Sequence, residues 1–215
     1  MGIKERKERE KRRRRNAILK AAKKIVGKNG VEGMSMNQVA ELTELNKATL
    51  YSYYSNKDDL IDAIVYDGLV LLEKEFEKHD DKSAPGITKV IDLTRATFNF
   101  YRTYPVYFSA MNHQERRGPG ARMETPFAIK GDEIASRIFG KIQMSIEQGI
   151  EDGSIRREID INHCSMLFYS YTYGVMHTLL SKEDVYSDVL GLDSLAVERQ
   201  ALEFLKYFLE RREQL

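Results

Sequence analysis

Polar side chains that suit contacts with DNA gather between residues 46 and 57 of this 215-residue chain. Lys47 and Lys57 supply cations for phosphates, and Lys47 can also reach guanine. Thr49 and Ser52 carry small hydroxyls for phosphates or base edges, and nearby tyrosine hydroxyls can donate to phosphates. Together with two upstream positions, the candidate DNA-binding residues are Ser35, Met36, Asn46, Lys47, Thr49, Ser52, Tyr53, Tyr54 and Lys57.

Residues 35–54 have the spacing of a helix-turn-helix that would position these side chains. Ser35, followed three residues later by Gln38, forms a capping box that starts a short helix, and Asn46 is expected to cap a second one. Such a pair places the N-terminal residues of its second helix at base edges in the major groove.

Two residues of the second helix, Ala48 and Leu50, are expected to face inward and hold it against the preceding helices. The alternative interpretation of this segment is a plain three-helix bundle in which the tyrosines belong to the core. The charge pattern favours the DNA-binding helix-turn-helix over this plain bundle.

Charge is divided unevenly along the chain. Residues 1–60 hold 15 basic and 8 acidic residues, a net charge of +7, whereas residues 61–215 hold 19 basic and 25 acidic residues, a net charge of −6. A basic end suits phosphate. Residues 4–15 alone contain nine basic and three acidic residues. We interpret them as a flexible arm that adds minor-groove or phosphate contacts, the alternative being a solvated extension of the first helix.

The remaining pattern is helical throughout. Apolar residues recur at helical spacing, and no run alternates with the period of a strand. The predicted fold is all-α, with nine helices in two domains: an N-terminal three-helix DNA-binding domain over 1–57 and a larger C-terminal helical domain over 58–215. The predicted helices cover residues 11–28, 36–42, 47–54, a fourth from a Ser55 cap to about 79, 87–103, 105–115, 126–152, 161–181 and 195–212.

The segment AILKAAKKIVGKNGVEGMSMNQVAELTELNKATLYSYYSNKDDL, residues 17–60, resembles the DNA-binding domain of the tetracycline-repressor (TetR) family. Within it, TLYSYYSNKDDL resembles the family's recognition helix, which ends in aromatic residues followed by Lys and acids. EQGIEDGSIR, residues 147–156, resembles the family's usual end of helix seven. The chain departs from the family at Leu45, Ala48 and Asn46, where small residues, glycine and serine are common, and these departures bear on the operator sequence.

The resemblance implies that the C-terminal domain dimerises and binds an effector. Dimerisation also follows from DNA recognition, since two recognition helices about 34 Å apart read a palindrome. We expect a homodimer through the last two helices, which are apolar around more than one stripe, although that excess can also be buried within one chain. Their apolar and neighbouring residues are Met166, Leu167, Tyr171, Val175, Thr178, Leu179, Leu195, Val197, Leu202, Leu205, Phe208 and Leu209.

An effector pocket is expected between the fifth and eighth helices, because ligands bind inside helix bundles. The middle of the chain is rich in aromatic residues and methionine, which predicts a small apolar or aromatic effector. The alternative is that these side chains are ordinary core. The candidates are Phe98, Tyr101, Tyr104, Phe108, Met111, Met123, Phe127, Met144, Tyr169, Tyr173 and His177.

Other chemistry finds no support in the sequence. The four histidines show no metal-ligand spacing, and the neighbours His163 and Cys164 point apart on a helix, so neither a metal site nor a catalytic residue is predicted. No glycine-rich phosphate loop occurs, and no cofactor is expected. No apolar run could span a membrane, and the single cysteine fits a reducing cytoplasm.

These patterns predict a regulator of transcription rather than an enzyme. We expect a ligand-responsive repressor whose dimer binds double-stranded operator DNA and is released by its effector. The alternative is a regulator without a small-molecule effector, whose C-terminal domain serves dimerisation and docking of a protein partner.

Overall fold

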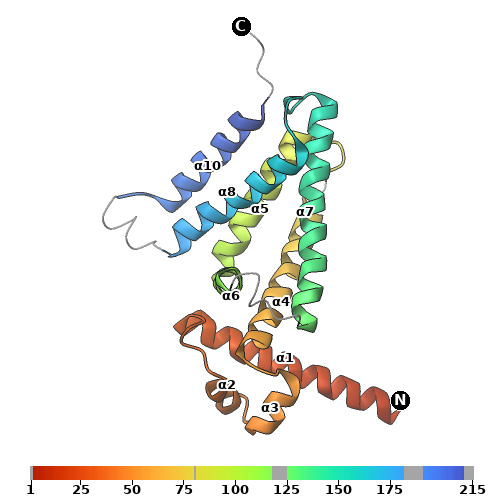
Figure 1. The fold of residues 1–215 in the computed structure, drawn as a ribbon, viewed down its shortest axis with the longest axis vertical. Coiled ribbons are helices and arrows are strands. Elements are labelled where there is room, and N and C mark those ends of the chain that lie inside the picture. Colours follow the sequence, from red (N-terminus) through yellow and green to blue (C-terminus); the bar gives the residue numbers. More distant parts are fainter. Residues whose placement is uncertain (1, 80, 118–124, 182–190, 211–215) are drawn as a thin grey trace. The chain divides into compact units, whose positions relative to one another are not determined.

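The computed structural model describes residues 2–79, 81–117, 125–181 and 191–210. Within these residues the chain forms nine α-helices, and the one β-type contact is an isolated bridge between Ile155 and Glu210 (Figure 1). The predicted all-α fold is confirmed. The helices are α1 (Ile3–Asn29), α2 (Met36–Leu42), α3 (Lys47–Tyr53), α4 (Lys57–Lys78), α5 (Gly86–Thr103), α6 (Pro105–Arg116), α7 (Pro126–Asp152), α8 (Ile161–Ser181) and α10 (Ser194–Leu209).

The chain divides into two compact units. The head unit comprises residues 1–69 and 104–132, and the second unit comprises residues 70–103 and 133–215. The head unit therefore contains α6 and the first half of α4 besides the helix-turn-helix. The predicted domain boundary after residue 57 does not coincide with this division. The assignment of DNA binding to residues 1–57 and of the other roles to residues 58–215 stays a prediction.

The head unit is organised around α1, which is longer than the sequence pattern indicates. Its second half buries an apolar stripe that includes Ile18, Ala22 and Ile25, and the helix ends before Gly30, whose φ is +71°. Its first half continues without a break to Ile3. The interpretation of residues 4–15 as a flexible arm is therefore wrong, because this segment extends the first helix.

The second unit depends on close helix packing. A Cβ at Gly86, where α5 begins, would lie 2.1 Å from the backbone nitrogen of Gly149 in α7, so this crossing has no room for a side chain. The end of α7 and the residues that follow it cap α5: Asp152 Oδ2 accepts from the Gly86 N–H at 2.8 Å, and Ser154 Oγ accepts from the Ile87 N–H at 3.2 Å. These bonds satisfy N–H groups that a helix start leaves without partners.

Candidate DNA-binding surface

The first helix of the motif, α2, begins at the predicted capping box. The Gln38 N–H donates to Ser35 Oγ at 3.3 Å, and the Ser35 N–H donates to Gln38 Oε1 at 2.8 Å. Val39 and Ala40 are buried within the head unit, whereas Leu42 is exposed. A tight turn follows in which Glu44 has a φ of +55°. The capping box is confirmed.

The recognition helix, α3, is fixed at its start and in its middle. Asn46 Oδ1 accepts from the Thr49 N–H at 2.8 Å, which confirms the predicted cap. Leu50 is fully buried and anchors the helix to the rest of the head unit. Ala48 is exposed, so the expectation that it faces inward is wrong. A helix advances about 100° per residue, which turns position 48 well away from position 50.

One face of α3 stays outside the core. Lys47, Ala48, Tyr51 and Ser52 are exposed, and Lys47 and Tyr51 share one side because they lie four residues apart. Tyr51 is absent from the sequence-based candidates. The spacing between Tyr51 and Lys47 is the sequence signal that identifies Tyr51. Positions 47 and 51 lie together on the exposed side of the helix, whereas positions 50 and 54 lie together on the buried side.

Two predicted DNA contacts are buried instead. Tyr54 is 1% exposed, and its ring stacks on Phe127 with the centroids 5.8 Å apart. Burial raises the pKa of Tyr54 far above its ordinary value, and the hydroxyl has no hydrogen-bond partner among the described residues. Met36 is also buried. Neither side chain can touch DNA in this conformation, because each lies inside the head unit.

The other predicted contacts lie near the surface in different roles. Ser35 and Asn46 are exposed, but their side-chain oxygens already cap helices. The Ser52 hydroxyl donates to the Thr49 carbonyl at 2.7 Å, which leaves its oxygen free to accept. Thr49, Tyr53 and Lys57 are half-buried. Their contacts with DNA stay predictions.

The start of α4 differs slightly from expectation. Asn56 Oδ1 accepts from the Asp59 N–H at 2.8 Å, so Asn56 caps the helix rather than Ser55. The Ser55 N–H instead donates to Asp59 Oδ2 at 2.8 Å. Together these two hydrogen bonds of Asp59 hold the junction between α3 and α4 in one geometry.

A buried carboxylate ties α4 to α6 and to the start of α7 inside the head unit. Asp62 is 1% exposed and accepts from Gln114 Nε2 at 2.9 Å, from Thr125 Oγ1 at 3.0 Å and from the Arg117 guanidinium. The Thr125 hydroxyl in turn accepts from the Ala128 N–H at 3.0 Å. Since Gln114 and Arg117 lie at the end of α6 and Thr125 lies directly before α7, this network fixes α4 in the head unit.

A second polar cluster joins α1, α4 and α6. Lys23 Nζ lies 2.6 Å from Asp67 Oδ2 and 3.1 Å from Tyr107 Oη, and the Tyr107 hydroxyl donates to Asp67 at 2.9 Å. Partial burial lowers the pKa of Lys23, but its bonds to Asp67 and Tyr107 outweigh this, so the pKa lies above the ordinary value. A Cβ at Gly68 would lie 2.8 Å from the Tyr107 ring, which shows how closely α4 and α6 pack.

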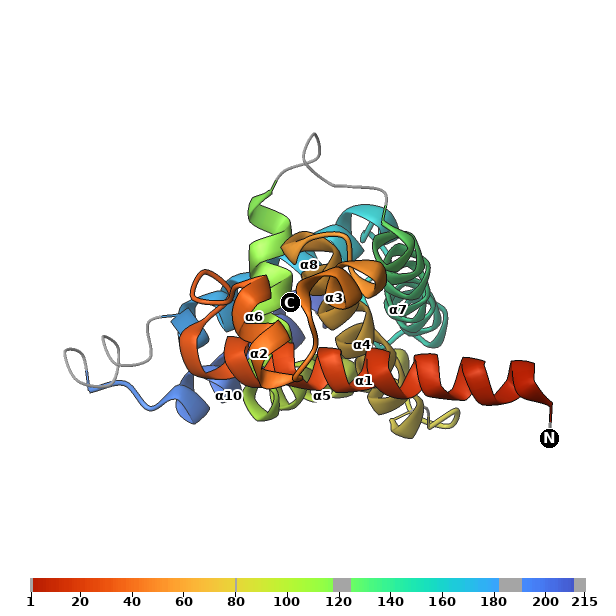
Figure 2. The same cartoon turned by 90° about the horizontal axis from the view of Figure 1, so that it is seen from below.

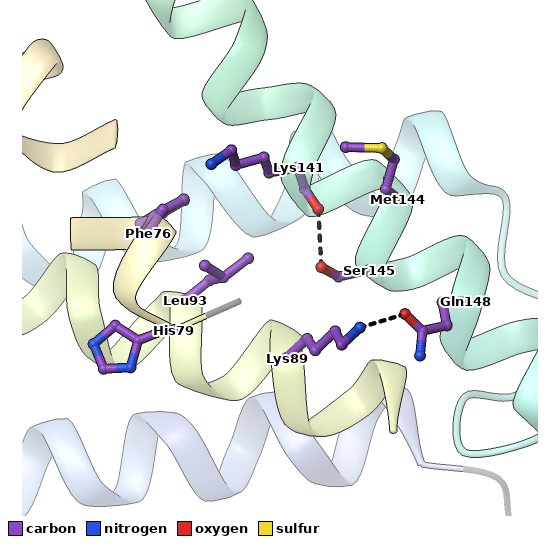
Figure 3. A pocket seen from close by; sticks show the side chains of 8 residues that line it. All are labelled: Phe76, His79, Lys89, Leu93, Lys141, Met144, Ser145 and Gln148. Carbon is purple, nitrogen blue, oxygen red and sulfur yellow. Dashed lines mark hydrogen bonds between the residues drawn. The ribbon is translucent and has the colours of Figure 1, made fainter. Parts of the chain in front are cut away.

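The second unit contains a pocket of about 290 Å³. Figure 3 shows side chains from α5, α7 and the end of α4 around it. Lys89 Nζ donates to Gln148 Oε1 at 2.7 Å, while Lys141 has no ion-pair partner among the described residues. The pocket therefore combines ammonium groups with apolar walls. Its lining consists of Phe76, His79, Lys89, Leu93, Lys141, Met144, Ser145 and Gln148.

The predicted effector residues do not gather at this pocket. Met144 lines it, and Met123 lies outside the described residues. Three candidates are buried in the core of one unit or the other, namely Phe98, Tyr101 and Phe108. Phe127 is half-buried and stacks on Tyr54. The remaining candidates are exposed or half-buried: Tyr104, Met111, Tyr169, Tyr173 and His177. Tyr173 stacks on Tyr169 and also contacts His177, so the predicted shared face on α8 exists.

Groups that could support other chemistry lie apart. Burial raises the pKa of the Cys164 thiol, and His163 beside it is exposed. Among the residues that the structure describes, no group of three His, Cys, Asp or Glu side chains could hold a metal ion. In the same part of the chain no helix is both long and apolar enough to cross a membrane.

Comparison with known proteins decides the family. The family of bacterial regulatory proteins described as the tetR family matches residues 18–64, which span the second half of α1, the helix-turn-helix and the start of α4. The chain is a DNA-binding transcriptional regulator of the TetR family. The resemblance seen in residues 17–60 is thereby confirmed, and the chain is a regulator rather than an enzyme.

Curated relatives extend this similarity beyond the head unit. The uncharacterized HTH-type transcriptional regulator YhgD of Bacillus subtilis is 27% identical over 146 residues, covering 66% of this chain and 72% of YhgD. The HTH-type transcriptional repressor NicS of Pseudomonas putida is 25% identical over 174 residues, covering 79% of this chain and 80% of NicS.

The fold of the whole chain is also found in solved structures. The structure of AibR in complex with isovaleryl coenzyme A and operator DNA has a TM-score of 0.68 and 21% identity. The similarity covers 89% of this chain and 97% of AibR. This likeness shows that the chain shares its all-α fold with AibR.

Proposed function

We propose that this TetR-family regulator is a repressor that binds a palindromic operator as a homodimer and leaves it when an effector binds. The observation that carries the DNA part is the face of α3 formed by Lys47, Ala48, Tyr51 and Ser52. This face is exposed while Leu50 and Tyr54 hold the helix in place. NicS, whose name describes a repressor, supports the sign of the regulation.

Enrichment of operator sequences from a random duplex library tests the palindrome. A dimer should select two inverted half-sites whose centres lie about 10 base pairs, or a multiple of one helical turn, apart. Selection of a single, asymmetric site would contradict dimeric recognition. Failure to enrich any sequence would contradict the operator itself.

Exposed apolar side chains of α8 and α10 support the homodimer. Met166 and Leu167 on α8 and Phe204 and Tyr207 on α10 are 57–62% exposed. The two helices already contact each other, since the Tyr171 ring stacks on Phe204 at 5.8 Å. Outer faces of this kind mark interaction sites in proteins, and a second copy of the chain would cover them.

Light scattering coupled to gel filtration tests the dimer. The wild-type chain should elute with twice its mass of 24.9 kDa, and Phe204→Glu should shift it to the monomer. Ile129→Glu, which changes another exposed apolar residue, on α7, should stay dimeric. A wild-type monomer, or the same shift in both variants, would contradict this interface.

The pocket of the second unit supports the effector. Its apolar walls suit a small apolar or aromatic group, and the ammonium groups of Lys89 and Lys141 suit an acidic one. We propose an apolar molecule that carries a carboxylate or phosphate. AibR, which shares the fold, was solved with isovaleryl coenzyme A, a molecule with both features.

Helix α4 offers a route from the pocket to the DNA. Its residue Phe76 lines the pocket, and the same helix begins at Lys57 directly after α3. In this proposal α4 adopts two positions, one in the DNA-binding state and one in the released state. An effector that binds one of these states more tightly shifts the equilibrium between them, and the shift is set by the difference between its two affinities. The Asp62 network would carry the movement into the head unit, because it fixes α4 there.

Calorimetric titration with isovaleryl coenzyme A tests the pocket. Binding should weaken in Lys141→Gln and stay unchanged in Lys74→Gln, which removes an exposed lysine of α4 in the same unit. Equal binding by both variants would place the ligand elsewhere. Absence of binding would contradict this ligand class and favour the regulator without an effector.

A further inference from the structure

The N-terminal half of α1 is a helix without an apolar face. Residues 4–15 hold nine basic and three acidic side chains, and residues 4–14 are all exposed. A helix that is polar all round gains little from packing on its own protein, so its charges face solvent or a partner. The same lack of an apolar face argues against insertion into a membrane surface.

Four of the nine basic residues share one side of this helix. Lys4, Lys7, Lys11 and Arg14 follow one another at spacings of three, four and three, and the next step of four reaches the buried Ile18. They therefore continue the stripe with which α1 packs on the head unit. The acids Glu5, Glu8 and Glu10 fall away from the centre of this stripe, although Glu10 reaches Arg14 at 2.7 Å.

The stripe leads directly to the recognition helix. Arg14 lies within electrostatic range of Tyr53 at the end of α3, and the next residue, Arg15, lies over the Phe127 ring at 5.4 Å. Figures 1 and 2 both show α1 running past α3, with its N-terminal half projecting beyond it. Among the described residues, Lys4, Lys7 and Lys11 form no ion pair.

We propose that the α1 stripe, formed by Lys4, Lys7, Lys11 and Arg14, is a second DNA-binding element that holds backbone phosphates beside the bases read by α3. Residues 3–15 span about 18 Å at the helical rise, the length of about five base pairs of duplex. The element binds without reading sequence, because it offers flexible cations to phosphates. It rests on the DNA binding of the head unit and extends the footprint of that site.

Two triple variants with equal charge loss test the proposal in the full-length chain. Lys4→Gln, Lys7→Gln and Lys11→Gln remove the stripe, whereas Arg6→Gln, Arg9→Gln and Arg13→Gln, also spaced by three and four, remove three cations from the opposite side. Glutamine is nearly as good a helix former as lysine or arginine, so the far-ultraviolet circular dichroism should stay unchanged. The probe is a fluorescent duplex of random sequence, about 40 base pairs long, titrated by anisotropy at several salt concentrations.

The stripe variant should bind at least about tenfold more weakly at 0.1 M salt, and the slope of log K against log salt should fall by about 2–3. The opposite-side variant should lower that slope by less than about 1. Equal effects of the two variants, or an unchanged slope for the stripe variant, would overturn the proposal and favour an acidic protein partner. If the wild-type chain itself bound no duplex, the DNA binding of the head unit would be contradicted as well. Wild-type binding with equal effects of the two variants would contradict only the role of the α1 stripe.

Discussion

In the head unit the buried carboxylate of Asp62 accepts three hydrogen bonds, whereas in the second unit the pocket-lining Lys141 has no ion-pair partner among the described residues. The Lys23, Asp67 and Tyr107 cluster is likewise complete within the head unit. Buried hydrogen-bonded networks of this kind hold one arrangement, while a charge beside a pocket that has no ion-pair partner remains available for a ligand. The difference assigns precise positioning of α3 to the head unit and adaptability to the second unit.

The largest expected effect comes from breaking the Asp62 network. Asp62→Ala removes the carboxylate that is hydrogen-bonded to the nearly buried guanidinium of Arg117 and leaves only Asp58 at 3.6 Å, which should cost about 3–5 kcal/mol in the free energy of unfolding. Urea denaturation measures this loss. Asp58→Ala on the same helix is the control, because Asp58 lies 3.5–3.6 Å from its partners and is 38% exposed, so its removal should cost less than about 1 kcal/mol. Similar losses in both variants would show that the network does not stabilise the head unit.

A pair of glycines in α7 tests whether the second unit is adaptable everywhere. A Cβ at Gly149 would lie 2.5 Å from Ile155 Cδ1, so Gly149→Ala should cost about 1–3 kcal/mol through overpacking. Gly140 has nothing within 4 Å of such a Cβ, and Gly140→Ala should stabilise the helix by about 0.5–1 kcal/mol. Thermal unfolding of both variants measures the difference. If Gly149→Ala were neutral, the packing of Ile155 against α7 would be looser than its geometry indicates.

Two buried tyrosines of the head unit sharpen the contrast between paired and unpaired hydroxyls. Tyr107→Phe removes a hydroxyl that bridges Lys23 and Asp67 and should destabilise the chain by about 1.5 kcal/mol. Tyr54→Phe removes a hydroxyl without a partner among the described residues, so it should be neutral or stabilising by up to about 1 kcal/mol. A marked loss in Tyr54→Phe would reveal a partner for this group.

The smallest expected effect concerns acid stability of the second unit. The bidentate hydrogen bond from Arg137 lowers the pKa of Glu73 below its ordinary value of 4.5. A carboxylate with a lowered folded-state pKa stabilises above its unfolded pKa, and the contribution disappears as the pH falls through the folded value. Glu73→Gln should therefore lower stability slightly at pH 7 and flatten its decline below about pH 4.5. Parallel pH profiles for wild type and variant would contradict this pairing.

Local signals in the sequence predicted the parts of the head that depend on neighbouring residues. The capping box at Ser35 and the Asn46 cap are both present, since each needs only a side chain and an N–H group three residues away. The outward face of α3 was assigned by side-chain type, which placed Tyr54 on the DNA and omitted Tyr51. Projecting the helix from the buried Leu50 would have assigned both correctly.

The second unit was less predictable because its features depend on packing between distant segments. Aromatic residues such as Phe98 and Tyr101 suit a core and a pocket equally well, and burial places them in the core. The lysines that line the pocket, Lys89 and Lys141, lie about fifty residues apart in the sequence and meet only through the crossing of α5 and α7. No local sequence pattern indicates that these two lysines line the same pocket.

The most direct test of the account compares two duplexes in an anisotropy titration at physiological salt. One carries the sequence enriched from the random library and the other a scrambled version with the same composition. The wild-type chain should prefer the enriched sequence by at least about 10³-fold, and Lys47→Ala with Tyr51→Ala should lose most of that preference while retaining salt-dependent binding to both. An unchanged preference in the double variant would contradict recognition through the outward face of α3.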